Sequence, residues 1–339
     1  MWRRIASSLL LGTWLSLFCS VDCFAQAATR PMSLLSRTST AQFEIVLGKI
    51  IPTNLTLRHA QSESTSEQPG GANESLLVSS YGQIPVIHYE YVSPEERLVL
   101  DFNRQQEMMF HHLIFEPQLK NQGSPVVESA FHQDARGAVR LIVHSADATL
   151  EYKAASLWHL ILFEPQVAQA HLIPLLEQIR PSWELAPKAL ELPGLLQNFR
   201  KAYSLPDPAR INSLIARLGD NSFQRRQSAD RELRQMGPLL IPILQSIDST
   251  RLDSEQRSRI AGILTAAKTF TTGDTPERIV HWLAADKSVW LKFLSDDDQQ
   301  VREHAAEHLT QLLGHPIEFS PLAPLAERTA QLEQLRRRL

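Results

Sequence analysis

The stretch Leu218–Gly237, LGDNSFQRRQSADRELRQMG, decides the fold because its pattern returns in Leu294–Gly314, LSDDDQQVREHAAEHLTQLLG. In each copy an arginine, an alanine and a leucine follow at intervals of three and four residues, which places them on one stripe of a helix. We therefore predict two helical copies of one structural unit. The matching positions are Leu218, Asp220, Gln224, Arg226, Ala229, Leu233 and Gln235 in the first copy, and Leu294, Asp296, Gln300, Arg302, Ala305, Leu309 and Gln311 in the second.

Both helices are expected to begin and end in the same way. A side chain that can accept a hydrogen bond from a free backbone N–H stands before each helix, with a glutamine three residues later, which is a variant of the capping box. A glycine that can close a helix in the left-handed conformation follows each copy. The predicted N-caps are Asn221 and Asp297, and the predicted closing glycines are Gly237 and Gly314.

A third, degenerate copy lies between these two. Asp253 with Gln256 can cap a helix there, and Arg257, Ile260 and Leu264 repeat the stripe with isoleucine in place of alanine. A short helix cannot bury an apolar stripe alone, whereas helical pairs stacked side by side can. The sequence therefore predicts an α-solenoid.

These helices resemble a run of HEAT repeats, closely over Leu205–Leu339 and less closely over Ser156–Leu205. In that family a proline lies in the first helix of each pair, an aspartate at the turn, and an arginine six residues later. Pro174 and Pro242 match the proline, and they also predict a bend shared by two helices. The resemblance implies that the matching Asp and Arg residues are structural and bond along the stack: Asp220, Arg226, Asp296 and Arg302. The whole chain is also similar to uncharacterised exported bacterial proteins that join a β-rich module to HEAT-like helices.

Residues 76–153 alternate between apolar and polar side chains, as in Ile87–Tyr91 and Leu98–Phe102. Loops rich in Gly, Pro, Asn and Asp separate the runs, which is typical of an antiparallel sheet. Met108–Phe115 is apolar almost throughout and predicts a central strand. We expect an α+β protein with an antiparallel β-rich domain over 76–153, followed by HEAT-like helices over 154–339 that begin after a capping Ser156.

The segment 28–75 is expected to be a polar leader and flexible linker that holds one strand, Gln42–Ile51. Gln61–Ser75 has almost no apolar side chain, so it cannot bury enough surface to offset the entropy lost on ordering.

Residues 1–27 have the pattern of a secretion signal. Arg3 and Arg4 precede the apolar run Ile5–Phe18, and Ala25-Gln26-Ala27 provides a cleavage site. The run is shorter than the ~18 residues expected of a spanning helix. We therefore expect a soluble protein exported to the periplasm or outside the cell, with no transmembrane segment after processing.

Several kinds of chemistry are disfavoured. Both cysteines, Cys19 and Cys23, lie inside the signal, so the processed chain has no disulfide and no thiolate ligand. The net charge of −3 offers no overall basic surface for nucleic acid. We recognise no phosphate-binding, dinucleotide or nucleophile-elbow motif, and we expect no cofactor. The strand histidines are expected to be ordinary surface or core residues: His88, His111, His112, His132 and His144.

His304-Ala-Ala-Glu307-His308 matches the inverted zinc-protease motif H-x-x-E-H, in which two histidines on one helix face bind zinc beside a glutamate base. The repeat stripe at Arg302, Ala305 and Leu309 explains the same stretch without a metal, and this is the interpretation that we favour.

The leading functional expectation is an exported, non-catalytic scaffold that binds a protein or peptide through a helical surface. A metal-dependent hydrolase that uses His304, Glu307 and His308 is one alternative. Ligand binding by the β-rich domain, with the solenoid as its mount, is another. The expected binding residues are Gln224, Arg225, Glu303, His304, Glu307 and His308.

Overall fold

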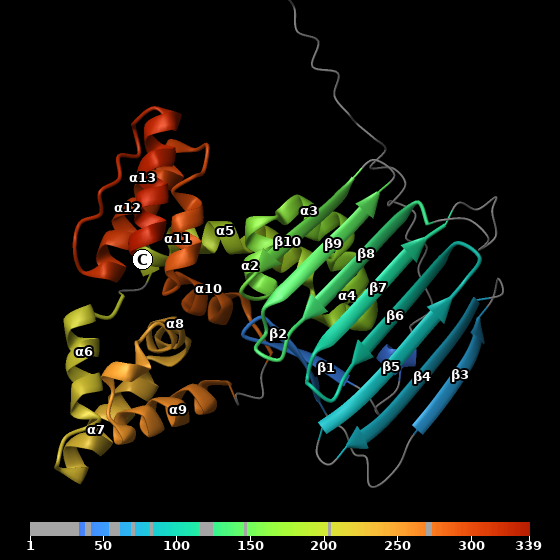
Figure 1. The fold of residues 1–339 in the computed structure, drawn as a ribbon, viewed down its shortest axis with the longest axis horizontal. Coiled ribbons are helices and arrows are strands. Elements are labelled where there is room, and N and C mark those ends of the chain that lie inside the picture. Colours follow the sequence, from blue (N-terminus) through green and yellow to red (C-terminus); the bar gives the residue numbers. More distant parts are fainter. Residues whose placement is uncertain are drawn as a thin grey trace, which may run out of the picture. The chain divides into compact units, whose positions relative to one another are not determined.

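The computed structural model describes residues 34–37, 42–53, 62–68, 72–81, 84–115, 125–145, 148–202, 205–268 and 273–339 (Figure 1). The predicted secretion signal, at residues 1–27, lies outside them. The described part is an antiparallel β-sheet region followed by helices, which confirms the predicted α+β class.

Eight strands form one antiparallel meander, in which each strand pairs only with its neighbours in sequence. The central strands are β6 and β7, so the prediction of a central strand at Met108–Phe115 is confirmed. The strands are β3 (Ser62–Gln68), β4 (Ala72–Tyr81), β5 (Ile84–Val92), β6 (Glu96–Phe102), β7 (Met108–Ile114), β8 (Val127–Gln133), β9 (Val139–Ser145) and β10 (Thr149–Ala154).

The linker predicted at Gln61–Ser75 is wrong where the structure describes it, because β3 and the start of β4 lie there. Every residue of β3, from Ser62 to Gln68, pairs with β4. A strand at the edge of a sheet is held by backbone hydrogen bonds on one side, so it needs few buried apolar side chains.

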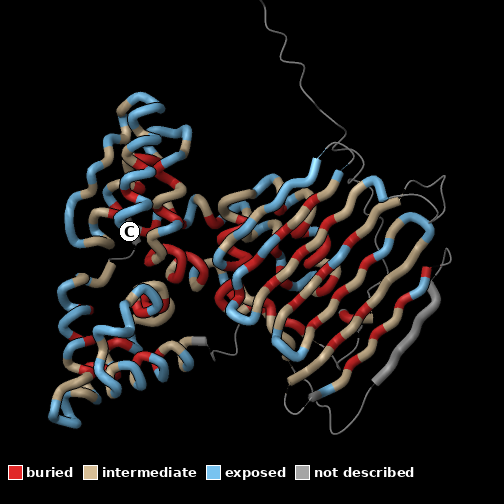
Figure 2. The backbone as a smooth tube through the Cα atoms, in the orientation of Figure 1, coloured by how far each residue is buried: buried red, intermediate tan, exposed pale blue. Residues whose placement is uncertain are grey.

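Burial alternates along the strands, as Figure 2 shows by its change between red and tan. Leu98, Leu100 and Phe102 are buried, whereas Val99 and Asp101 between them are partly exposed. The buried face packs in one apolar core with residues of a hairpin and of four short helices. These helices are α1 (Leu34–Arg37), α2 (Leu157–Phe163), α3 (Pro165–His171) and α4 (Ile173–Ile179).

The single strand expected at Gln42–Ile51 is instead a hairpin of β1 (Gln42–Val46) and β2 (Lys49–Thr53). The two turn residues, Leu47 and Gly48, have φ of 51° and 69°. A two-residue hairpin turn with positive φ matches the twist of its strands, and glycine takes that conformation without strain.

The remaining helices lie after residue 184, interleaved with single 3-10 turns. They are α5 (Leu185–Ala202), α6 (Pro208–Arg217), α7 (Phe223–Gln235), α8 (Leu240–Gln245), α9 (Ser254–Lys268), α10 (Pro276–Ala284), α11 (Lys287–Phe293), α12 (Gln299–Leu313) and α13 (Leu325–Arg338). Helices α6 to α9 share a small apolar core, although Ile241 of α8 belongs to the larger core that the sheet joins. Helices α10 to α13 contribute to that larger core. The α-solenoid arrangement of these helices stays a prediction.

The two repeat prolines do not bend long helices. Pro174 lies in the first turn of α4, after a break at Leu172, and Pro242 lies in the first turn of the short α8. The missing N–H of a proline costs nothing in a first turn, so each proline is accommodated where a helix begins. The capping by Ser156 is confirmed, since its Oγ accepts a hydrogen bond from the backbone N–H of His159 at the start of α2.

Candidate interaction site

An arginine holds the turn before its own helix in all three copies of the repeat. Arg226 Nη1 donates to the carbonyl oxygens of Asp220 and Asn221, at 2.7 and 3.1 Å. Arg302 Nη1 bonds to the carbonyl oxygens six and five residues before it, both at 2.8 Å. Arg257, in the degenerate copy, reaches the carbonyl oxygen five residues before it, at 2.6 Å. The repeated arginine therefore satisfies backbone acceptors that a turn would leave open.

The repeated aspartates also act within their own turns. Asp220 Oδ1 accepts from the backbone N–H of Ser222, and Asp296 Oδ1 from that of Asp298, both at 2.8 Å. The bonding along the stack that the HEAT resemblance implied is thus not made by these aspartates. Because each aspartate closes a turn, the helices start one residue later than predicted, and Ser222 and Asp298 take the N-cap positions. The closing glycines are confirmed, with φ of 64° at Gly237 and 74° at Gly314.

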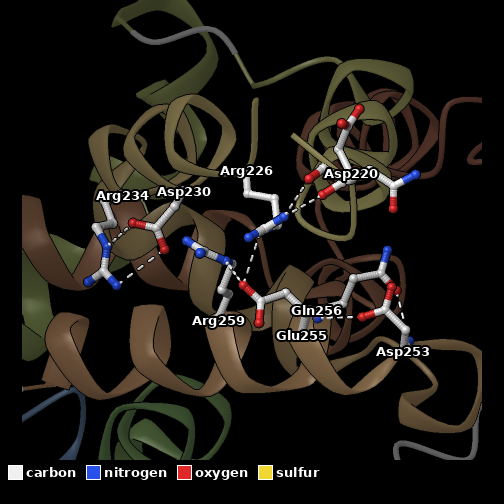
Figure 3. A network of polar contacts seen from close by, with 9 residues as sticks. Asp220, Arg226, Asp230, Arg234, Asp253, Glu255, Gln256 and Arg259 are labelled. Carbon is white, nitrogen blue, oxygen red and sulfur yellow. Dashed lines mark hydrogen bonds and ion pairs between the residues drawn. The ribbon is translucent and has the colours of Figure 1, made fainter. Parts of the chain in front are cut away.

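Helices α7 and α9 lie side by side and are joined by charged side chains, as Figure 3 shows. Glu255 of α9 lies 3.2 Å from Arg226 of α7 and 2.7 Å from Arg259 of its own helix. Further along the contact, Arg234 binds Asp230 at 2.7 Å. One glutamate therefore lies between two arginines where the two helices meet.

A second pair of arginines shares a glutamate between α6 and α7. Glu232 of α7 lies 3.4 Å from Arg210 and 3.7 Å from Arg217, both on α6. In each group one glutamate lies between two arginines.

The predicted binding residues Gln224 and Arg225 are exposed near the start of α7. Arg225 approaches Asp220 at 3.3 Å, with most of its side chain in solvent. Phe223 beside them is 63% exposed, and the guanidinium of Arg226 lies 5.8 Å from the centre of its ring. Exposed aromatic and arginine side chains are the types that contribute most to binding at protein interfaces.

The predicted residues on α12 divide between surface and core. Glu307 is exposed and Glu303 and His304 are partly exposed, but His308 is fully buried, so its assignment as a surface binding residue is wrong. The His308 ring stacks on Trp290 at 3.7 Å, and its Nε2 donates to the carbonyl oxygen of Ala284 at 2.9 Å.

This arrangement also gives the H-x-x-E-H stretch a role other than zinc binding. Because a carbonyl oxygen can only accept, His308 Nε2 carries a proton and does not face a metal. Within the described ranges, no three His, Cys, Asp or Glu residues are arranged to hold a metal ion.

The strand histidines separate onto the two faces of the sheet. His88, His111, His132 and His144 lie on the more exposed face, and His112 lies on the buried face, 2.9 Å from Glu96. On the exposed face His88 binds Asp101 at 2.7 Å. A shallow depression of about 470 Å³ near β8–β10 is lined by His132, Asp134, Arg140 and Lys153 among others, and its mixed charges favour no single class of ligand.

Sequence reasoning missed a buried Ser–His–Asp arrangement. Ser156 Oγ lies 2.8 Å from His159 Nδ1, and His159 Nε2 lies 3.2 Å from Asp286 Oδ2. Burial alone would raise the pKa of Asp286, but the hydrogen bond and charge of His159 and the bonds from Ser288 outweigh it and lower that pKa. Ser156 is only 3% exposed, and a Cβ on Gly48 would lie 2.6 Å from its Oγ. With no room for a substrate at the serine, the arrangement ties α2 to α11.

A second missed residue, Asp274, lies beside this arrangement. Its carboxylate accepts from the backbone N–H groups of Leu47 and Gly48, both at 2.8 Å, and from the indole of Trp158 at 2.6 Å. Burial raises the pKa of Asp274 even though these bonds act in the opposite direction. Its partners are far away in sequence, so no local pattern could have identified it.

No family model matches the chain, and no curated protein or solved structure matches it either. Among the helices that the structure describes, none has the length and apolar character needed to cross a membrane.

Proposed function

We propose that the chain is an exported, non-catalytic interaction protein that binds a protein or peptide through the helical-repeat surface of α6, α7 and α9. The observation that carries this proposal is the start of α7, where an exposed Phe223 lies beside Arg225 and Arg226. Helices α6 to α9 share a small apolar core, so that surface stands on a packed scaffold. A rigid helical scaffold with exposed aromatic and arginine side chains is suited to binding another chain.

Capture from the exported fraction tests this proposal. The full processed chain serves as bait, alongside a Phe223→Ala, Gln224→Ala double variant and a control double variant on α13, Leu325→Ala, Thr329→Ala. Leu325 and Thr329 are exposed, as are Phe223 and Gln224. The control variant therefore shows whether truncating two exposed side chains elsewhere on the protein also reduces capture. A partner retained by the wild type and the control but lost from the α7 variant supports the proposal. Equal capture by all three baits contradicts it.

Export is the second part of the proposal and rests on the sequence of residues 1–27. Mass spectrometry of the protein from the exported fraction should find a chain that begins at or near Ala28. An uncleaved chain that stays inside the cell would contradict it.

A further inference from the structure

We propose that the partner of the α6–α7–α9 surface is an acidic protein segment, rich in Asp and Glu, that binds the outward arginines of α6 and α7. This inference rests on the function proposed above for the same surface and adds the chemistry of the partner.

The charge of this part of the chain differs in sign from that of the whole. Residues 205–268 contain ten Arg and Lys residues against seven Asp and Glu, a net charge of +3, in a chain whose net charge is −3. Nine of the ten positive residues are arginines. The planar guanidinium can bind a carboxylate through two parallel hydrogen bonds, which the point charge of lysine cannot do.

The structure shows which of these arginines face solvent. The side chains of Arg210 and Arg225 are 65% and 69% exposed, and Arg231 is exposed as well. Arg226 and Arg259 are mostly covered, and Arg226 joins α7 to Glu255 of α9. The outward arginines are therefore available to a partner, whereas Arg226 helps to fix the helices that present them.

Helical spacing gathers the outward charges on one side of α7. Arg225, Ser228 and Glu232 follow at intervals of three and four residues and so share one stripe, and Arg231 lies on the neighbouring stripe with Ser228. Glu232 of this stripe attracts both Arg210 and Arg217 from α6, which brings two more guanidinium groups to the same side. Arg231 is exposed and adds a further guanidinium group next to this stripe.

The position of Glu232 among the arginines favours an acidic protein over a nucleic acid as the partner of this surface. A nucleic acid presents a continuous row of phosphates, and proteins that bind it use clustered basic surfaces. A fixed glutamate between the arginines would repel such a row. An acidic peptide can place its carboxylates at intervals that avoid Glu232.

Fluorescence anisotropy with the full processed chain tests the inference. The probe is a labelled peptide of Glu and Ala residues, and the matched probe has Gln in place of every Glu. At low ionic strength we expect the Glu peptide to bind at least about tenfold more tightly, with the preference shrinking as salt screens the charges. An Arg225→Ala, Arg231→Ala double variant should bind the Glu peptide about tenfold more weakly.

The control is the double variant Arg336→Ala, Arg338→Ala on α13, which removes the same charge from another exposed helix. It should change the affinity by less than about twofold, since rim charges far from a site mainly alter steering. Far-ultraviolet circular dichroism should be the same for wild type and both variants, because the altered side chains are exposed.

Three results would overturn the inference: equal affinity for the Glu and Gln peptides, equal loss in both double variants, or equally tight binding of inorganic polyphosphate. A concentration-dependent dimer that is lost in Arg225→Ala, Arg231→Ala would replace the external peptide with a second copy of the chain, and would overturn it as well. If the capture experiment finds a partner that depends on α7 while the Glu peptide fails, the acidic chemistry is wrong and the proposed function stands. If the substitutions on α7 change neither capture nor peptide binding, both the proposed function and the acidic partner are contradicted.

Discussion

Trp158 donates its indole N–H to the carboxylate of Asp274 at 2.6 Å, although the two residues are 116 positions apart. The same carboxylate binds both backbone N–H groups of the β1–β2 turn. One buried side chain therefore joins the hairpin, the first helix after the sheet and the segment that leads into α10.

Replacing Asp274 by Ala should destabilise the protein strongly. It leaves three buried N–H donors without this acceptor, and at 1–3 kcal/mol for each unsatisfied group the loss should be at least about 3 kcal/mol. Urea denaturation measures it. The exposed Asp248→Ala is the control and should cost about 1 kcal/mol or less, as for the loss of a capping side chain. Equal losses for both variants would show that Asp274 does not hold the three segments together.

The raised pKa of Asp274 gives a pH dependence with a defined sign. Because burial favours the protonated form in the folded state, its contribution to stability is complete below the ordinary aspartate pKa of 3.8 and is lost as the pH rises through the raised folded pKa. The free energy of unfolding of the wild type relative to Asp274→Asn should therefore increase from pH 7 towards pH 4. A difference that shrinks over this range would show that the hydrogen bonds outweigh burial.

His281 should make the protein less stable as the pH falls, which is the opposite pH dependence to that of Asp274. Burial lowers its pKa from the ordinary histidine value of 6.5, with Glu277 acting against the shift. The ring packs edge-on against Phe199, with the two ring centres 5.4 Å apart. The folded state favours the neutral ring, so stability is present above pH 6.5 and is lost as the pH falls through the lowered folded pKa. His281→Gln should lose less stability than the wild type between pH 7 and pH 5 in thermal unfolding. Parallel losses would assign the acid sensitivity to other groups.

Arg302 should be more costly to remove than the exposed Arg257. Besides the two carbonyl oxygens of its own turn, it donates to the carbonyl oxygen of Pro321 at 3.0 Å, and it is largely buried. Hydrogen bonds from a charged group contribute about 1.5–3 kcal/mol each, so Arg302→Ala should cost about 3 kcal/mol or more. Arg302→Lys should recover little, because a single ammonium cannot reach the same set of acceptors. Arg257→Ala is the matched control and should cost about 1 kcal/mol.

If His308 packs against Trp290 and binds no metal, its loss should act through packing alone. His308→Ala should destabilise the protein by about 3 kcal/mol through the cavity it leaves, as for other buried aromatic side chains. A chelator should leave the melting temperature of the wild type unchanged. Zinc near one equivalent in the purified wild type, lost in His304→Ala, would instead support the hydrolase alternative.

The sequence predicted those features whose cause is local. Alternation placed Leu98, Leu100 and Phe102 on the buried face because a strand turns every second side chain the same way. The repeated arginines were found because three helices begin with the same turn. The cap at Asp253 is confirmed too, since its Oδ1 accepts from the backbone N–H of Gln256 at 2.7 Å.

Features that depend on distant partners were not predictable. Strand β3 looked like a linker because its sequence has no apolar side chain, whereas the structure pairs it with β4 along its whole length. The single carboxylates of Asp274 and Asp286 carry no pattern, since their partners lie in α2 and the hairpin. His308 looked like a ligand on its own helix, and only the approach of Trp290 and Ala284 gives it a packing role.

The meander order of the sheet has a consequence for how the chain folds. Each strand meets only the strands next to it in sequence, so the sheet can assemble by closing short loops in succession, and local contacts of this kind form quickly. The bond between Trp158 and Asp274 closes a far longer loop and must wait until both ends are in place. Refolding of this protein should therefore show early strand formation, followed by a slower phase in which the helices after α9 dock.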